Sequence, residues 1–302
     1  MVVCGESLID FIQQPDGAFI PVPGGSPKNT AIALARLGVP TALVSRVGTD
    51  RFGDLIHAQL QESGVDLSLM VRTAEPTTLA IASLDAAGAA SYSFYINGCA
   101  DGSWSVEGLP DNIGDPSFCV VAGSLALATP AMADALQHLL AREARAIIVL
   151  DPNIRRALIR NGGAVARRLD HWIAMSTIIK TSSEDLEWRH PGEPTAAVAQ
   201  RWLETGPSLV VVTHGGGGAE AFTANARTDQ AAPAVEVVDT VGAGDTLTAG
   251  LVEWLLRSGV EGRGDVAGLS AAQLDDGVAA AVALATDTCT RRGADPPWRR
   301  AR

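Results

Sequence analysis

The feature that most constrains the fold is a recurring alternation between short, wholly apolar segments and longer segments with helical periodicity. Such apolar runs occupy residues 41–47, 118–122, 146–150, 177–180 and 208–213. Strands that are apolar along their whole length are typical of a parallel sheet buried on both faces. We therefore expect an α/β fold, a doubly wound and mostly parallel sheet with helices on both faces.

Turn and cap residues mark where the helices between these runs begin and end. Ser26 can act as the N-cap of a first helix, with Pro27 in the first helical position and Gly38 just beyond the last turn. Thr129-Pro130 opens a later helix in the same manner.

Two stretches break the alternation. Residues 11–22 and 77–95 read as short strands with tight turns at Asp16-Gly17 and Ala87-Gly88, and neither stretch contains a helix. We expect them to form a small antiparallel sheet over the mouth of the main domain, although an edge extension of the main sheet would have the same pattern. A lid of this kind excludes water during group transfer.

The length of 302 residues suits one domain, 1–302, with a lid formed by about 11–23 and 72–103. The net charge of −11 excludes a general nucleic-acid binder, which would present a basic surface to phosphate. It leaves nucleotide binding open, because backbone dipoles and a metal ion can hold phosphate on an acidic protein.

Location and redox state follow from simple patterns. We expect no signal peptide, because the chain enters an apolar run at once, and no membrane span, because no window approaches the required length. Cys4, Cys99, Cys119 and Cys289 form no CxxC pair, and the histidines show no paired ligand spacing. These patterns predict a cytoplasmic protein with reduced thiols.

Residues 235–246 carry the clearest indication of chemistry. A strand-like run ends at Asp239, a Gly-Ala-Gly turn follows, and a helix begins near Asp245. Glycines let the backbone approach a ligand, and N–H groups at a helix N-terminus attract an anion. The chain has no GxxxxGK[ST] motif, so this predicted anion site is not a Walker-type P-loop.

Asp245 admits two interpretations. A carboxylate in the first turn of a helix usually caps it or interacts with its dipole. Beside an anion pocket, however, a negative side chain repels the ligand unless it has a chemical role there. Deprotonating a hydroxyl that attacks a phosphoryl group is such a role.

A second glycine-rich segment, residues 213–221, follows a predicted strand and contains a loose G-x-G-x-x-A pattern. The residues after it read as strand and turn, whereas the dinucleotide fingerprint must open a helix. This disfavours a dinucleotide oxidoreductase. A loop that contacts phosphate or ribose and an ordinary surface turn both remain open.

These segments resemble the motifs of the ribokinase/PfkB family of carbohydrate kinases, and the similarity covers nearly the whole chain. Residues 239–245 (DTVGAGD) resemble its C-terminal motif, and residues 24–31 (GGSPKNTA) with 34–38 (LARLG) resemble its N-terminal motif. Residues 151–155 (DPNIR) and 289–294 (CTRRGA) are similar to segments of the fructokinase-like branch. The resemblance implies a ribokinase-like fold.

The resemblance also implies roles in phosphoryl transfer. Asp245 would be the base that takes the proton from a sugar hydroxyl. The N–H groups of Gly242, Ala243 and Gly244 would form the anion hole, and Arg155 would lie near the transferred phosphate.

On the acceptor side, the family pattern implies contacts to the sugar from Asp10, Gly25 and Asn29, and we expect the lid to add Tyr95 and Asn97. On the nucleotide side, it implies contacts to ATP from Thr213, Gly215, Gly218 and Lys180. Glu184 would hold Mg²⁺ through water, and a monovalent cation, commonly potassium in this family, would lie near Asp239.

Departures from the family pattern concern the substrate. Thr181 stands where an asparagine is common, Ile96 where fructokinases often have an arginine, and His214 where an apolar residue is usual. The chain is thus predicted to be an ATP-dependent sugar kinase, with fructose as the leading acceptor. The alternatives are a kinase for 2-keto-3-deoxygluconate or a nucleoside, and a catalytically silent sugar-binding regulator. A homodimer through the lid is compatible with each of these functions.

Overall fold

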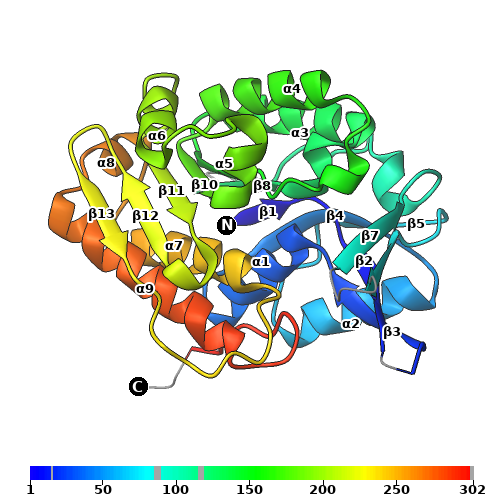
Figure 1. The fold of residues 1–302 in the computed structure, drawn as a ribbon. Helices are drawn as coiled ribbons and strands as arrows, with labels where there is room; N and C mark the ends of the chain where they lie inside the picture. Colours follow the sequence, from blue (N-terminus) through cyan, green and yellow to red (C-terminus); the bar gives the residue numbers. More distant parts are fainter. Residues whose placement is uncertain (15, 85–89, 115–118, 300–302) are drawn as a thin grey trace.

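The computed structural model describes residues 1–14, 16–84, 90–114 and 119–299 (Figure 1). Within them, a nine-stranded sheet has the order β13-β12-β11-β10-β9-β8-β1-β4-β5. In that order the strands span Arg227–Gln230, Ala219–Phe222, Leu209–Thr213, Ile178–Ser182, Ile147–Asp151, Cys119–Gly123, Val2–Cys4, Ala42–Gly48 and Met70–Thr73. Neighbouring strands from β11 to β5 are parallel, and β12 and β13 add an antiparallel edge.

Helices cover both faces of this sheet (Figure 1). One face carries α3 (Pro130–Arg142), α4 (Gly162–Met175), α5 (Ser183–Arg189) and α6 (Thr195–Leu203). The other carries α1 (Ser26–Arg36), α2 (Arg51–Glu62), α7 (Ala243–Arg257) and α9 (Ala271–Cys289), with the short α8 (Arg263–Ala267) beside them. The predicted doubly wound α/β fold is confirmed.

The strands are apolar on both sides because each side meets a helical layer. In β9, Ile147 and Val149 belong to one core cluster, whereas Ile148 and Leu150 belong to the other. The apolar runs predicted at 41–47, 146–150, 177–180 and 208–213 are strands of this sheet, as is the described part of 118–122.

The small sheet is separate from the main one. It has the order β3-β2-β6-β7 and consists of Leu8–Gln13 (β2), Phe19–Gly24 (β3), Leu79–Leu84 (β6) and Ala90–Tyr95 (β7). The β2–β3 and β6–β7 pairs are antiparallel as predicted, but the central β2–β6 pair is parallel, because the two hairpins lie side by side in the same direction. The turn predicted at Ala87-Gly88 lies outside the described residues.

The start of α1 differs from the prediction. The N-cap is Gly25, with Ser26 and Pro27 as the first two helical residues, and no side chain caps the helix. The hydroxyl of Ser26 instead donates to Asp245 of α7, 219 positions further along the chain. At the other end of the helix, Gly38 follows the C-cap with φ of 77°, as predicted.

The prediction of a strand that ends at Asp239 is also wrong. No strand is assigned to residues 231–242, and Val237 and Val238 are more than half exposed. The backbone N–H groups of Val238 and Asp239 donate instead to the carbonyl of Cys289, at the end of α9. A β-branched run forms a strand only where a neighbouring strand can pair with it.

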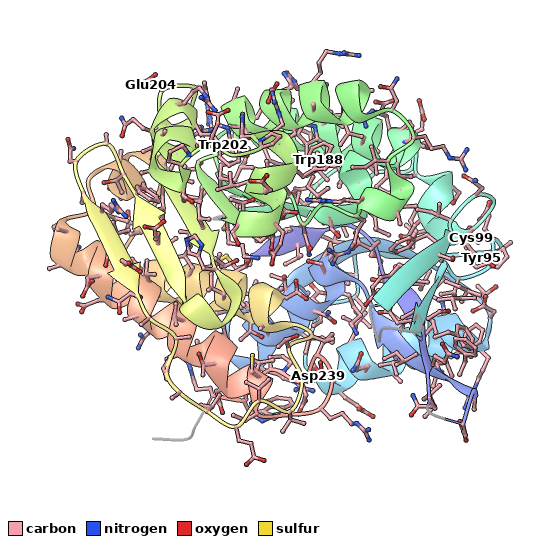
Figure 2. All side chains as sticks on the ribbon, viewed as in Figure 1. Tyr95, Cys99, Trp188, Trp202, Glu204 and Asp239 are labelled. Carbon is pink, nitrogen blue, oxygen red and sulfur yellow. The ribbon has the colours of Figure 1, made fainter. Side chains whose placement is uncertain are left out.

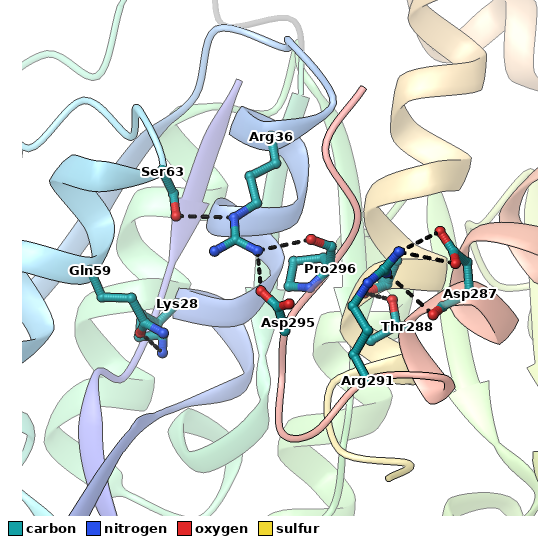
Figure 3. A network of polar contacts seen from close by, with 10 residues as sticks. Lys28, Arg36, Gln59, Ser63, Asp287, Thr288, Arg291, Asp295 and Pro296 are labelled. Atoms are coloured by element: carbon teal, nitrogen blue, oxygen red, sulfur yellow. Dashed lines mark hydrogen bonds and ion pairs between the residues drawn. The ribbon is translucent and has the colours of Figure 1, made fainter. Parts of the chain in front are cut away.

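The C-terminal segment binds α1 to the rest of the molecule (Figure 3). Arg36, in the last turn of α1, donates to the Ser63 hydroxyl, the Asp295 carboxylate and the Pro296 carbonyl. Arg299 donates its backbone N–H to the carbonyl of Arg36. These contacts hold α1 beside the turn that precedes α7.

Strand polarity positions the polar residues described next. In a parallel sheet, ligand sites lie beyond the carboxyl ends of the strands. Glu6, Ser124, Asn153, Glu184 and Thr213 lie at or just after the ends of β1, β8, β9, β10 and β11. In the described part of the chain, no helix has the length and hydropathy to span a membrane.

Candidate active site

Two adjoining cavities lie beyond these strand ends. The larger, of about 800 Å³, is the more polar of the two and reaches from the small sheet to the start of α7. The smaller, of about 520 Å³, is mainly apolar and lies between the glycine-rich loop, residues 232–240 and α9. Both are lined by Glu184, Thr213, Thr240 and Gly244, so these residues mark the junction of the cavities.

Asp245 lines the larger cavity from the first turn of α7 and is 7% exposed. Its Oδ1 accepts a hydrogen bond from the Ser26 hydroxyl at 2.6 Å, and its Oδ2 accepts one from the Asn29 side-chain amide at 2.9 Å. Burial raises the pKa of this carboxyl, and the two hydrogen bonds act in the opposite direction. The group is therefore an oriented carboxylate of increased basicity.

The turn before Asp245 has little room for side chains. Gly242 has φ of 81°, and a β-carbon there would lie 2.8 Å from the β-carbon of Ala294. A β-carbon on Gly244 would lie 2.9 Å from Nζ of Lys180. Gly242 and Gly244 line the larger cavity, while Ala243 lines the smaller one. The turn thus presents the start of a helix to both cavities, which favours an anion there.

Lys180 brings a positive charge against this turn. Its ammonium group lies 2.8 Å from Oδ2 of Asp151, and both side chains are buried. Although burial alone would lower it, the pKa of Lys180 is raised by the charge of Asp151 and its hydrogen bond, so the lysine stays protonated. An acidic chain thus holds a protonated lysine against this turn.

The larger cavity brings together four residues that were predicted to lie near the sugar or the transferred phosphate. Asp10, Gly25, Asn29 and Arg155 all line it. Burial raises the pKa of Asp10 to about 6, although Lys28 and Arg155 oppose the shift. Gly25 has φ of 107°, and a β-carbon there would lie 2.6 Å from the carbonyl of Glu6.

Glu6 lines the same cavity but was not predicted. It is 1% exposed, and its Oε1 accepts from the Ser124 hydroxyl at 2.7 Å and from the Ser26 N–H at 3.2 Å. Burial raises its pKa to about 7. Its position just after an apolar strand could have indicated that Glu6 belongs to the site. Its hydrogen bonds could not be predicted, because the two serine partners lie 20 and 118 positions away in the sequence.

The lid residues Tyr95 and Asn97 do not line either cavity. Tyr95 is 55% exposed and lies at the outer side of the small sheet (Figure 2). Tyr92 and Phe94 line the larger cavity in their place. Alternate residues of a strand share a face, so the buried Ile96 could have indicated Phe94 and Tyr92.

Of the residues predicted to contact the nucleotide, Thr213, Gly215 and Gly218 line the smaller cavity, whereas Lys180 lines only the larger one. Gly218 has φ of 99°, and a β-carbon there would lie 2.0 Å from the carbonyl of Gln230. His214 lines neither cavity. Its ring Nε2 lies 3.3 Å from Oε2 of Glu220.

The two carboxylates predicted to hold cations, Glu184 and Asp239, lie in different surroundings. Glu184 is exposed at the junction of the cavities, which suits Mg²⁺, an ion held by one or two carboxylates, waters and phosphates. Asp239 lines neither cavity. It accepts from the backbone N–H groups of Val241 at 3.0 Å and Gly293 at 2.8 Å, and it lies in the loop before α7 (Figure 2). The described residues contain no cluster of three or more His, Cys, Asp or Glu side chains that could hold a metal.

The chain is similar to known carbohydrate kinases in sequence. The profile of the pfkB family carbohydrate kinases matches residues 1–301. A fructokinase of Rhizobium leguminosarum bv. trifolii is 36% identical over 282 residues, 92% of this chain and 86% of that protein.

Solved structures share the fold. The crystal structure of a fructokinase with bound ATP from Xylella fastidiosa has a TM-score of 0.90 and 29% identity, and the match covers 97% of this chain and 93% of the other. An aminoimidazole riboside kinase from Salmonella enterica, at 23% identity and a TM-score of 0.83 over 97% and 94%, has the same fold.

Proposed function

The chain belongs to the pfkB family of carbohydrate kinases, and we propose that it transfers the γ-phosphoryl group of ATP to a hydroxyl of fructose. It is a carbohydrate kinase, a phosphotransferase with an alcohol group as acceptor. The use of ATP is supported by the ATP-bound fructokinase from Xylella fastidiosa, which shares the fold at 29% identity.

One observation carries the proposal. Asp245 stands at the polar cavity, one residue after the glycine that the two cavities share. A sugar in the polar cavity and a nucleotide in the apolar one would meet at this turn. A base must lie within hydrogen-bond reach of the hydroxyl that it deprotonates, and this carboxylate is in place for that role.

The reaction follows from the residues around the junction. Asp245 accepts the proton of the attacking hydroxyl, and its raised pKa makes it a stronger base than an exposed aspartate. The N–H groups of Gly242 and Gly244 and the Lys180 ammonium stabilise the negative charge that develops on the transferred group. The N–H of Ala243, which was also predicted to belong to the anion hole, donates instead to the carbonyl of Thr240 at 3.3 Å. Arg155 adds a planar cation on the acceptor side.

The remaining residues bind and shield the substrates. Asp10 accepts hydrogen bonds from sugar hydroxyls, and Tyr92 and Phe94 cover the sugar and exclude water. Thr213, Gly215 and Gly218 bind the nucleotide. Glu184 is the residue that would hold Mg²⁺, which when bound neutralises phosphate charge.

The choice of acceptor rests on the relatives. Fructose is supported by the 36% identical fructokinase, whereas Ile96, which is buried where fructokinases often have an arginine, does not favour one acceptor over another. An ADP-coupled assay with fructose, 2-keto-3-deoxygluconate and a nucleoside, with potassium and magnesium varied, separates the candidates. We expect fructose to give the highest kcat/KM, and a higher value for either other acceptor would reject it.

The replacement Asp245→Asn tests the assignment of the base. Turnover should fall by roughly 10²-fold or more, whereas calorimetry should show that the sugar still binds. Asp134→Asn, on the exposed surface of α3, is the matched control and should retain full activity. Near-normal turnover in the Asp245 variant would reject the assignment.

We also propose that two copies associate through the lid. Strand register places Ile12, Ile20 and Tyr92 on one face of the small sheet, and their side chains are between 39% and 49% exposed. An exposed apolar face of this kind favours association. Light scattering on the purified protein measures the assembly, and a monomer at all concentrations would exclude this interface.

A further inference from the structure

The Ser26 hydroxyl is the feature of the site that family resemblance did not assign. As the first residue of α1, Ser26 could have been expected to serve its own helix, but its hydroxyl makes no capping hydrogen bond. It donates to Oδ1 of Asp245 at 2.6 Å, and the two residues are 8% and 7% exposed.

Two residues of one helical turn hold the two oxygens of the carboxylate. Ser26 and Asn29 are three positions apart in α1, so their side chains share a face of the helix. Ser26 donates to Oδ1 and Asn29 to Oδ2, which fixes the plane of the carboxylate. An ionised carboxylate has about four acceptor sites, so each oxygen keeps one for the hydroxyl of a sugar.

Ser26 is itself held in place. Its N–H, one of the unpaired donors at the start of α1, donates to Oε1 of the buried Glu6 at 3.2 Å. The same oxygen accepts from the Ser124 hydroxyl at 2.7 Å. A chain of contacts therefore runs from β8 and β1 through Ser26 to Asp245.

We propose that Ser26 is a positioning residue for the catalytic base, which it keeps ionised and oriented toward the acceptor hydroxyl. The proposal rests on the proposed function, because it takes Asp245 as the base. Lys180 from β10 and Lys28 from α1 also favour the ionised form of Asp245, whereas Asp151 from β9 opposes it. Ser26, like Asn29, is a neutral donor to this carboxylate, so its replacement changes no charge.

The test replaces Ser26 by alanine and by threonine. A hydrogen bond to a charged group contributes enough that its loss should lower kcat by about tenfold and move the acid limb of the kcat–pH profile up by about one pH unit. Threonine keeps the hydroxyl and should restore the wild-type limb. Ser45→Ala removes a hydroxyl that is equally buried but bonded to Ser7, and it should leave the profile unchanged.

A second measurement does not depend on activity. Titration of the ¹³C-labelled Asp245 carboxyl by NMR, identified by its absence in Asp245→Asn, should show the same upward shift in Ser26→Ala without nucleotide or sugar. An unchanged titration would overturn the proposal even if kcat fell, because the loss would then be purely structural. If the wild type phosphorylates no sugar, the proposed function fails, but the NMR titration still decides the role of Ser26.

Discussion

Replacing Lys180 by methionine leaves the carboxylate of Asp151 buried without its ion-pair partner. Both side chains are less than a tenth exposed, and Nζ lies 2.8 Å from Oδ2. Methionine preserves most of the volume of the side chain, so the change in stability reports the charge. Among the polar contacts of Asp151, the Thr248 hydroxyl at 3.4 Å is too distant to compensate.

The expected loss can be estimated from this geometry. Breaking a buried pair by removing one partner costs about 3–5 kcal/mol, because an uncompensated charge remains. At about 2.1 cal/mol/K of unfolding entropy per residue, 302 residues give about 0.6 kcal/mol per degree, so Tm should fall by about 5–8 °C. Because Nζ lies against Gly244, kcat/KM for ATP should also fall, by roughly tenfold or more.

Urea unfolding and a coupled assay measure the two effects, and the chain supplies its own control. Lys28 is also fully buried, but its ammonium contacts the Pro23 carbonyl at 2.8 Å and the Gln59 amide oxygen at 2.6 Å (Figure 3). Lys28→Met leaves neutral acceptors in direct contact and should cost only about 1–2 kcal/mol. It is a control for unfolding and not for activity, because the charge of Lys28 also acts on Asp10 and Asp245. The double variant with Asp151→Asn should recover much of the loss. Equal losses for the two lysines, or a loss below about 1 kcal/mol for Lys180→Met, would refute the reasoning.

Three further predictions concern the backbone and the acidic groups. Gly242→Ala forces a β-carbon against Ala294 at a φ of 81° and should reduce turnover by about tenfold or more in the coupled assay. Gly264→Ala, where a β-carbon meets nothing within 4 Å, should be harmless. The pKa of Glu6 in the folded protein is raised to about 7, so the folded state loses stability as pH rises through that value. Relative to the wild type, Glu6→Gln should increase the free energy of unfolding by up to about 3 kcal/mol at pH 8 and by almost nothing at pH 4, as measured by urea unfolding. An ionised Asp10 accepts stronger hydrogen bonds from a sugar than a protonated one, so kcat/KM for the sugar should fall below about pH 6, and this fall should be smaller in Asp10→Asn.

The main sheet could be predicted because its apolar runs reflect burial on both faces. The same signal failed at residues 235–239, where the valines are exposed rather than paired in a sheet. Val235 and Val237 line the smaller cavity, so they form a wall for a ligand rather than part of the core. An apolar pattern alone does not distinguish burial against protein from burial against a bound molecule.

The candidate site was predictable where its residues lie in one motif. Asp245 and the glycines before it are contiguous, and their chemistry can be inferred from the turn itself. The ion pair of Lys180 and Asp151 depends on strand register, since β10 lies beside β9 with Ile179 paired to Leu150. The link from Glu6 through Ser26 to Asp245 joins three separate segments, and nothing in their spacing indicates that they meet.

Asp245 and its glycine turn are proposed to catalyse transfer of the γ-phosphoryl group from ATP to a sugar. ³¹P NMR of the purified protein with ATP and fructose tests it directly. The account predicts that a sugar phosphate and ADP appear in equal amounts, and that Asp245→Asn forms neither at a comparable rate. Release of inorganic phosphate without any sugar phosphate, or equal product from the Asp245→Asn variant, would contradict it.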